Sequence, residues 1–453
     1  RAEPFRKKSA PSSSTPTEDR GAAVLPHTSG TWLYRPFPAP DFSLTDLDGK
    51  EHSLSGLRGR PALVLFWATG VPESRLALES VAREREALAR AGVEVLAVAL
   101  DAPGDEPKVR AAAQGLALPV IVAPEEMAGT YSILSRYLYD RREDLRVPTL
   151  LLMSAQGEVV KVYRDSIAAS EVLMDIPRIE ASPAERLARA VPFAGTFYSA
   201  PGERNYFQYA LELSEQGFDA AAVVAFELAA KLDPSAITFY NLGTLYAKAG
   251  QPSQGRLAFE RALQLEPNYA EASNSLGALL AQSGDIPGAL ARFRAALQSK
   301  PEFADALNNL GFALFQTGEG AKAHELYERA LGLQPDFPEA FNNLGILFGQ
   351  QGDLERAESF FKQAVDKRPA YGEASNNLAL VLEARGDTAG AVAVLQRLLR
   401  ENPGFEAAYV TLCRIYLGAG REKEGLQVLE QLLQRNPKHP QGLEILRKLR
   451  PGG

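Results

Sequence analysis

The sequence is poor in the residues that carry thiol and metal chemistry. Its 453 residues include one cysteine and four histidines, and the histidines lie far apart along the chain. One cysteine excludes an internal disulfide and a thiolate metal cage, and the histidines show no ligand-like spacing. We therefore expect no metal and no cofactor, and most thiol and zinc chemistry is removed by composition alone.

Two further absences narrow the class of partner. The sequence contains no run of about 18 apolar residues, so no membrane span is predicted. Asp and Glu outnumber Lys and Arg, 56 to 49, for a net charge of −7. An acidic balance argues against nucleic acid and against anionic membrane surfaces as partners. The hydrophobic and charged fractions, 45% and 23%, are ordinary for globular proteins, and the length allows two or three domains.

The first part of the chain is rich in Ser, Thr and Pro. Residues 1–39 have almost no apolar clustering, so ordering them would not be offset by buried surface. We expect residues 1–39 to form a disordered linker.

Strand and helix patterns alternate over residues 40–180. Residues 62–67 (ALVLFW) form a short apolar run, which is typical of a strand buried on both faces. Residues 73–91 have apolar positions at helical spacing and end before a glycine, and residues 93–100 form the next predicted strand. This alternation predicts an α/β domain with a partly parallel sheet, followed by a connector over residues 181–202.

From residue 203 a repeat of 34 residues replaces this pattern. Gly243, Gly277, Gly311 and Gly345 are spaced by 34 residues, and the same step reaches Ala379 and Cys413. An aromatic residue or leucine lies 16 residues after each of these positions, and a proline lies 24 residues after each. Seven copies over residues 203–439 predict a solenoid of helix pairs, with a capping helix and tail at 440–453.

These small, aromatic and proline positions resemble the tetratricopeptide family. Small residues allow two antiparallel helices to approach closely, aromatic side chains fill the space between them, and proline ends the second helix. Cys413 occupies the slot of the small residue, so we interpret it as a buried structural residue. The resemblance implies a concave surface that binds a polypeptide.

A row of amide side chains precedes the small residue in most copies. Asparagine is a poor helix former, and its amide can donate to and accept from a peptide backbone. The row resembles the asparagine ladder in the repeats of O-linked N-acetylglucosamine transferase, which holds extended polypeptide. The predicted peptide-binding residues of this row are Gln208, Asn241, Asn309, Asn343 and Asn377.

An acidic residue lies four positions before most of these amides. The acidic row would favour Lys or Arg in the partner. Alternatively, the asparagines bond a neighbouring repeat and the acids match the helix dipole. The predicted acidic residues are Glu271, Asp305, Glu339 and Glu373.

The α/β segment resembles TlpA-like and redoxin members of the thioredoxin superfamily. Residues 39–44 (APDFSL) and 65–69 (LFWAT) carry the resemblance, which covers about residues 40–165. The family continues into a Trp-Cys-x-x-Cys motif, and here Val71 and Ser74 occupy the positions of the two cysteines. Pro148 matches the family's cis-proline. The resemblance implies a thioredoxin-like domain without the thiols that disulfide exchange needs.

A wider resemblance involves residues 141–145 (RREDL) and 204–207 (RNYF). They are similar to the C-terminal part of some bacterial ASPIC/UnbV proteins, which are typically exported. This resemblance implies an extracytoplasmic setting, periplasmic or secreted.

The sequence therefore predicts a non-catalytic scaffold that binds a protein or an extended, basic peptide in its solenoid. One alternative is a redox accessory whose partner supplies the cysteines. Another is a purely architectural role, with the solenoid as a spacer or an oligomer contact.

Overall fold

The computed structural model describes residues 30–102, 104–139, 145–164, 167–182, 185 and 205–449. The chain divides into two compact units, an α/β unit and a helical unit, which are considered separately. The predicted fold class, a thioredoxin-like α/β domain followed by an all-α solenoid of tetratricopeptide repeats, is confirmed.

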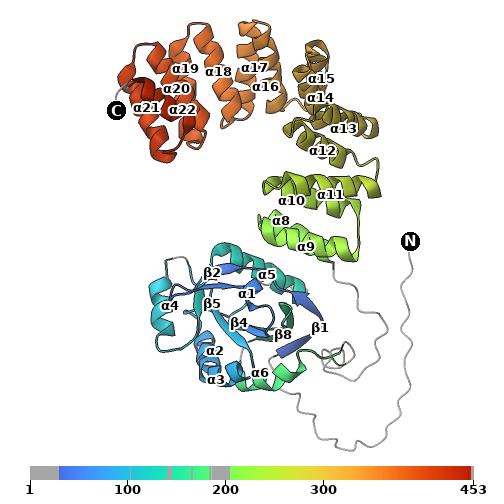
Figure 1. Ribbon diagram of the computed structural model, residues 1–453, viewed down its shortest axis with the longest axis vertical. Coiled ribbons are helices and arrows are strands. Elements are labelled where there is room, and N and C mark those ends of the chain that lie inside the picture. The colour runs from blue at the N-terminus through green and yellow to red at the C-terminus, as the bar shows by residue number, and fades with distance from the viewer. Residues whose placement is uncertain are drawn as a thin grey trace, which may run out of the picture. The chain divides into compact units, whose positions relative to one another are not determined.

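A six-stranded mixed sheet forms the centre of the α/β unit (Figure 1). In spatial order its strands are β1 (Gly30–Pro38), β8 (Glu158–Arg164), β7 (Thr149–Met153), β4 (Ala62–Trp67), β5 (Glu94–Ala99) and β6 (Val120–Val122). β4, β5 and β6 run parallel, whereas β7, β8 and β1 pair antiparallel. A separate ribbon pairs β2 (Ser43–Thr45) with β3 (Glu51–Ser53).

Helices cover both faces of this sheet, which is why every residue of β4 is buried. Alternate residues of a strand point to opposite faces. Leu63 and Leu65 pack in one core with residues of α2, α3, α4 and α6, and Phe66 contacts Tyr131 of α5, with ring centroids 4.8 Å apart. The helices are α1 (Leu54–Leu57), α2 (Pro72–Arg83), α3 (Arg85–Arg90), α4 (Glu106–Ala113), α5 (Glu125–Tyr139), α6 (Ala169–Asp175) and the 3-10 helix η1 (Ile176–Arg178).

The expected linker over residues 1–39 is wrong for residues 30–38, which form the edge strand β1. Trp32, Leu33 and Phe37 are buried, so this stretch gains enough apolar contact to order. Trp32 lies over the Lys161 ammonium, at 5.2 Å, and that ammonium forms a buried ion pair with Asp175 at 2.7 Å. The stretch was assigned to the linker because prolines surround its few apolar residues. Residues 1–29 lie outside the described residues.

The helical unit consists of paired helices followed by one closing helix (Figure 1). The first helices of the repeats are α8 (Tyr206–Glu215), α10 (Ala236–Lys248), α12 (Ala270–Gln282), α14 (Ala304–Gln316), α16 (Pro338–Gln350), α18 (Gly372–Ala384) and α20 (Glu406–Gly418). The second helices are α9 (Asp219–Leu232), α11 (Pro252–Leu265), α13 (Ile286–Ser299), α15 (Gly320–Leu333), α17 (Leu354–Lys367), α19 (Thr388–Glu401) and α21 (Glu422–Arg435). The closing helix is α22 (Pro440–Leu449).

Each turn within a repeat combines a glycine with a capping residue. Gly352 ends the first helix of its repeat with φ +80°, a conformation that residues with a Cβ rarely adopt. The following residue, Asp353, caps the second helix by accepting a hydrogen bond from the backbone N–H of Arg356 at 3.0 Å. The same Gly-Asp pair precedes α13 and α19, so two adjacent residues set the helix-turn-helix shape.

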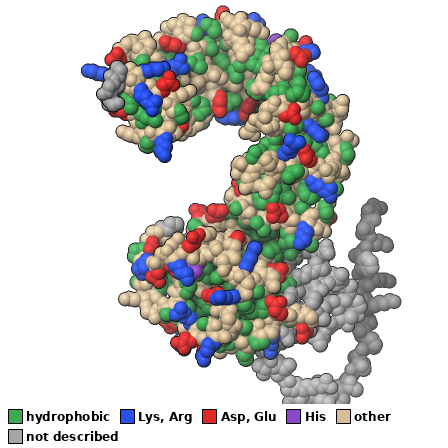
Figure 2. Space-filling view, viewed as in Figure 1, with side chains coloured by type: hydrophobic (Ala, Val, Ile, Leu, Met, Phe, Trp, Pro, Cys, Tyr) green, Lys and Arg blue, Asp and Glu red, His purple; other side chains and the backbone are tan. Residues whose placement is uncertain are grey.

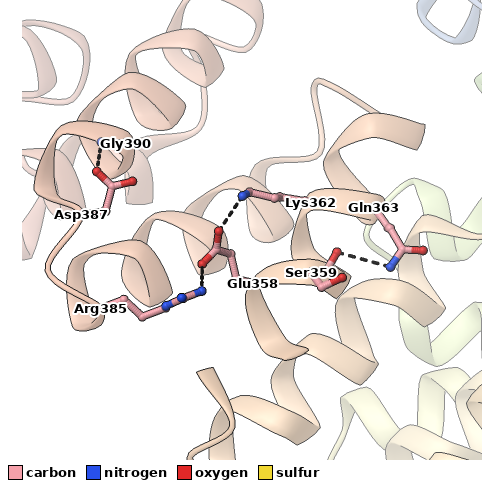
Figure 3. Close-up of polar contacts among 7 residues, drawn as sticks. All are labelled: Glu358, Ser359, Lys362, Gln363, Arg385, Asp387 and Gly390. Carbon is pink, nitrogen blue, oxygen red and sulfur yellow. Dashed lines mark hydrogen bonds and ion pairs between the residues drawn. The ribbon is translucent and has the colours of Figure 1, made fainter. Parts of the chain in front are cut away.

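Ion pairs also connect successive repeats (Figure 3). Glu358 of α17 accepts hydrogen bonds from Lys362 of the same helix and from Arg385, at the end of α18 in the next repeat. The hydrogen bond from Lys362 lowers the pKa of Glu358 most, with Arg385 adding to the effect. These exposed cations join neighbouring helix pairs through one carboxylate.

Candidate functional site

The first helices of the repeats line the inner surface of the solenoid. From α10 to α20 they contact one another directly, more closely than the second helices of successive repeats do. An array in which one helix of each pair is closer to its equivalents curves toward that side, as Figure 1 shows. Side chains exposed on the first helices therefore face the concave surface.

Three of the predicted asparagines form a ladder between successive first helices. The Nδ2 of Asn309 donates to the Oδ1 of Asn274 at 3.0 Å, and the Nδ2 of Asn343 donates to the Oδ1 of Asn308 at 2.8 Å. A third bond of 3.1 Å links Asn377 to Asn342. The alternative of bonding to a neighbouring repeat therefore applies to one donor of each amide. No partner of the Oδ1 atoms of the three donor asparagines occurs within residues 205–449.

The remaining members of the predicted row lie outside this ladder. The Nδ2 of Asn241 donates to the carbonyl oxygen of Ile237 in its own helix, at 2.9 Å. Gln208 is exposed on α8, and only its backbone N–H bonds, to the Asn205 side chain. The ladder is thus confined to α12, α14, α16 and α18.

The acceptor asparagines are functional candidates that the sequence reasoning missed. Asn308 and Asn342 are 6% and 5% exposed, which is unusual for this residue type and consistent with their bonds. The Oδ1 of Asn376 continues the row, is buried and has no hydrogen-bond partner in the described part of the chain. The doubled Asn-Asn before Leu in α14, α16 and α18 was the available signal.

The acidic row alternates between paired and unpaired carboxylates. Glu271 forms an ion pair with Lys300 at 2.8 Å, and Glu339 forms one with Arg368 at 2.7 Å. The hydrogen bond from Lys300 lowers the pKa of Glu271. Asp305 has no ion-pair partner within residues 205–449, and burial, followed by the charge of Glu339, raises its pKa.

Glu373 is exposed on α18 and, like Asp305, has no ion-pair partner among the residues of the helical unit that the structure describes. The difference follows from the residue that ends the second helix of the same repeat. That position holds Lys300 and Arg368 in the paired repeats, and Gln334 and Asn402 in the other two.

In the α/β unit, the loop after β4 leads into the N-terminus of α2. Val71 caps α2 and is partly exposed, whereas Ser74 is completely buried. The Val147–Pro148 peptide bond is cis, and the pairing of Phe66 with Thr149 places Pro148 at the same edge of the sheet as this loop. The three positions of the predicted redox site therefore come together around one end of β4 and β7.

No described group activates a nucleophile in this loop. The Ser74 Oγ is buried and has no hydrogen-bond partner in the described ranges, so no base lies within bonding distance. Val71 has no ionisable group. Cys413 lies in the other unit, where it is 0% exposed and burial raises the pKa of its thiol.

A residue that the sequence reasoning did not single out fixes the loop. Asp101, just beyond β5, accepts hydrogen bonds from the backbone N–H of Thr69 at 3.1 and 3.2 Å, and from the Thr69 hydroxyl. These bonds hold the chain between β4 and α2. A carboxylate two residues after a buried strand was the only sequence signal for this role.

Comparison with known proteins is consistent with both units. Residues 37–162 match the AhpC/TSA family, and residues 240–302, 280–344, 342–404 and 382–449 match the tetratricopeptide repeat. The α/β unit is similar to thiol-disulfide oxidoreductase ResA of Geobacillus thermodenitrificans (strain NG80-2), with 25% identity over 31% of this chain and 76% of the relative. ResA of Geobacillus kaustophilus (strain HTA426) is 28% identical over 30% of this chain and 71% of its own.

Solved structures resemble the helical unit. The crystal structure of MamA is 26% identical and is matched over 35% of this chain and 94% of its own, with a TM-score of 0.32. None of the helices described here is both long and apolar enough to span a membrane.

Proposed function

We propose that this protein is a non-catalytic scaffold that binds an extended polypeptide along the inner surface of its solenoid. The observation that carries the proposal is the asparagine ladder between α12 and α18. The tetratricopeptide architecture supports it, because stacked helix pairs present an extended concave surface.

The ladder suits recognition of a peptide backbone. Each inter-repeat bond uses one N–H of a donor asparagine and fixes the plane of its amide. The second N–H and the Oδ1 are left for the ligand, and a backbone offers both an acceptor and a donor. Because the amides are already oriented, binding costs less side-chain entropy than it would on free asparagines.

We infer that the α/β unit serves this scaffold as a docking module and performs no disulfide exchange. Exchange requires a thiolate that attacks and a second thiol that releases the mixed disulfide. Valine and serine stand at the two positions, and the serine has no base beside it. The unit keeps the surfaces of its fold for recognition.

The second candidate is a redox accessory whose partner supplies the cysteines. The similarity to thiol-disulfide oxidoreductases and the cis bond before Pro148 favour it. In this reading the α/β unit presents the loop at Val71 to a partner, and the solenoid is secondary. An extracytoplasmic setting, the relation to ASPIC/UnbV proteins and a preference for basic partners stay predictions.

The test selects binding peptides from a random display library with the full chain, and then compares two triple variants by fluorescence anisotropy. Asn309→Ala/Asn343→Ala/Asn377→Ala removes the proposed backbone contacts. We expect it to weaken binding about thirtyfold, or ~2 kcal/mol, for three lost hydrogen bonds. The control, Asn274→Ala/Asn308→Ala/Asn342→Ala, breaks the same inter-repeat bonds from the acceptor side and keeps the three donor amides.

We expect the control to lose similar thermal stability and to keep affinity within about fivefold, since its remaining cost is the freer orientation of the amides. Equal loss of affinity in both triples, in proportion to lost stability, would show that the ladder is only structural. Failure to select any peptide would also overturn the proposal. Binding that requires only residues 40–180 would favour the redox accessory.

A further inference from the structure

Two of the first helices carry an exposed carboxylate, a ladder asparagine and a large exposed apolar side chain on one face. On α14 these residues are Asp305, Asn309 and Phe312, and Phe312 is 38% exposed. Residues spaced by four and then three positions share one side of a helix. Leu307 and Leu314 of the same helix are buried, so the exposed face is distinct from the packed one.

α18 repeats this arrangement two repeats later. Glu373, Asn377 and Leu380 have the same spacing, and Leu380 is 48% exposed. Neither acid has an ion-pair partner within residues 205–449. Exposed apolar side chains of this size beside unpaired carboxylates mark a surface suited to a ligand with both chemistries.

The neighbouring first helices lack both features. On α12 the carboxylate is neutralised by Lys300, and an alanine, Ala278, stands at the apolar position. On α16 Glu339 is neutralised by Arg368, and Ile346 at the apolar position is half-buried. Free charge and exposed apolar surface therefore recur together at every second repeat.

We propose that α14 and α18 are two equivalent anchor points for one extended segment, each taking a basic residue and an adjacent large apolar residue. This inference rests on the proposed function and names the partner's chemistry. An extended chain places successive side chains on opposite sides. With its backbone on the asparagine row, one side chain reaches the carboxylate and the next reaches Phe312 or Leu380.

The spacing between the two anchors follows from helix packing. Packed helices lie 8–10 Å apart, so α14 and α18, with α16 between them, are separated by roughly 16–20 Å. An extended chain advances about 3.3 Å per residue, so the two basic–apolar pairs are five or six residues apart, to about one residue. Figure 2 shows acidic and apolar side chains together on the inner side of the curved array.

The selected peptides test this inference directly. We expect enrichment of a Lys or Arg next to a Leu, Ile, Phe or Met, repeated after five or six residues. Synthetic peptides with the pairs three to nine residues apart should bind most tightly at that spacing, with affinity falling on either side. A flat dependence on spacing would overturn the inference.

Matched variants locate the anchors. Asp305→Asn and Glu373→Gln should each weaken binding of the best peptide about threefold, whereas Glu271→Gln and Glu339→Gln, whose carboxylates are already paired, should leave it unchanged. Phe312→Ser and Leu380→Ser should each cost about tenfold. Leu257→Ser, at a 66% exposed leucine of the second helix α11, is the control and should have no effect.

The outcomes separate the two proposals. Peptides that depend on the donor asparagines but show no paired motif, or that respond equally to all four acid variants, would overturn the anchors and keep the proposed function. Binding that ignores the asparagine triple would overturn both. Loss of binding in Phe312→Ser and Leu380→Ser with unchanged melting temperature, and retention in Leu257→Ser, would support the anchors.

Discussion

The two units of this chain contain opposite combinations of scaffold and chemistry. The α/β unit has the cis bond before Pro148 and a fixed loop at the end of β4, but an aliphatic and an unactivated hydroxyl side chain stand where the resemblance places thiols. The helical unit has no reactive group among its described residues, yet its inner surface repeats the same polar side chains in four successive helices. Fold is retained in the first unit, whereas recognition groups are multiplied in the second, so function has to be argued from the site.

The largest effect is expected from restoring the missing thiols. Val71→Cys/Ser74→Cys places two thiols at the N-terminus of α2, where the helix dipole lowers a thiol pKa. Val71 is partly exposed and Ser74 is buried, which suits an attacking and a resolving thiol respectively. We expect dithiothreitol-driven insulin reduction to rise from background to a readily measured rate.

Val71→Cys alone is the control, because it can form a mixed disulfide but cannot release it. It should stay near background in turnover and still label with a thiol reagent. A double variant that folds normally and remains inactive would break the comparison, since it would show that the loop has lost the geometry as well as the thiols.

The sequence predicted the sheet and the repeats well because strong periodic patterns mark them. β4 is a continuous apolar run, and the 34-residue spacing appears in every helix pair. The first 39 residues were harder. Trp32 and Phe37 are separated by residues that include Pro36, and only the tertiary pairing with β8 shows that they are buried. Local composition does not contain that pairing.

A second prediction concerns the close approach of the two helices in a repeat. A Cβ at Gly345 would lie 2.6 Å from the Phe361 ring, so Gly345→Ala overpacks the core and should destabilise the solenoid by about 1–3 kcal/mol. Gly349 is in the same helix, and a Cβ there has its nearest neighbour at 3.8 Å. Gly349→Ala should therefore stabilise by up to about 1 kcal/mol through helix propensity.

Thermal melts of the full chain, followed by circular dichroism, measure both glycine variants. If the two substitutions shift the melting temperature in the same direction, close packing is not what the repeated small residue provides. The comparison would then lose its account of the solenoid as a rigid frame for the ladder.

The binding site was only partly accessible from sequence. The three donor asparagines were identified by their position in the repeat, but their partners were not, because a bond between repeats depends on how the helices stack. The ion pairs of Glu271 and Glu339 depend in the same way on residues 29 positions further along. A row of equal acids in the sequence thus becomes two pairs of unequal sites in the structure.

The smallest expected effect tests that inequality through opposite signs. The pKa of Glu271 is lowered by Lys300, so its ionised form stabilises the fold above its unfolded pKa of about 4.3, and this contribution is lost as pH falls through the folded pKa. The pKa of Asp305 is raised by burial and by Glu339. Its carboxylate therefore costs stability as pH rises through the folded pKa, and the cost is absent below the unfolded value of about 3.9.

Glu271→Gln should consequently lower, and Asp305→Asn should raise, the melting temperature near neutral pH, and both differences should shrink toward pH ~3. Each effect should stay below about 1 kcal/mol, because both carboxyls remain partly in water. Differential scanning fluorimetry from neutral to acidic pH measures the two variants side by side. Asp305→Asn would then be more stable and a weaker peptide binder, which is the pattern expected when a charge is kept for recognition at some cost to folding. Shifts of the same sign would show that the two acids are equivalent and that the alternation along the inner surface has no energetic basis.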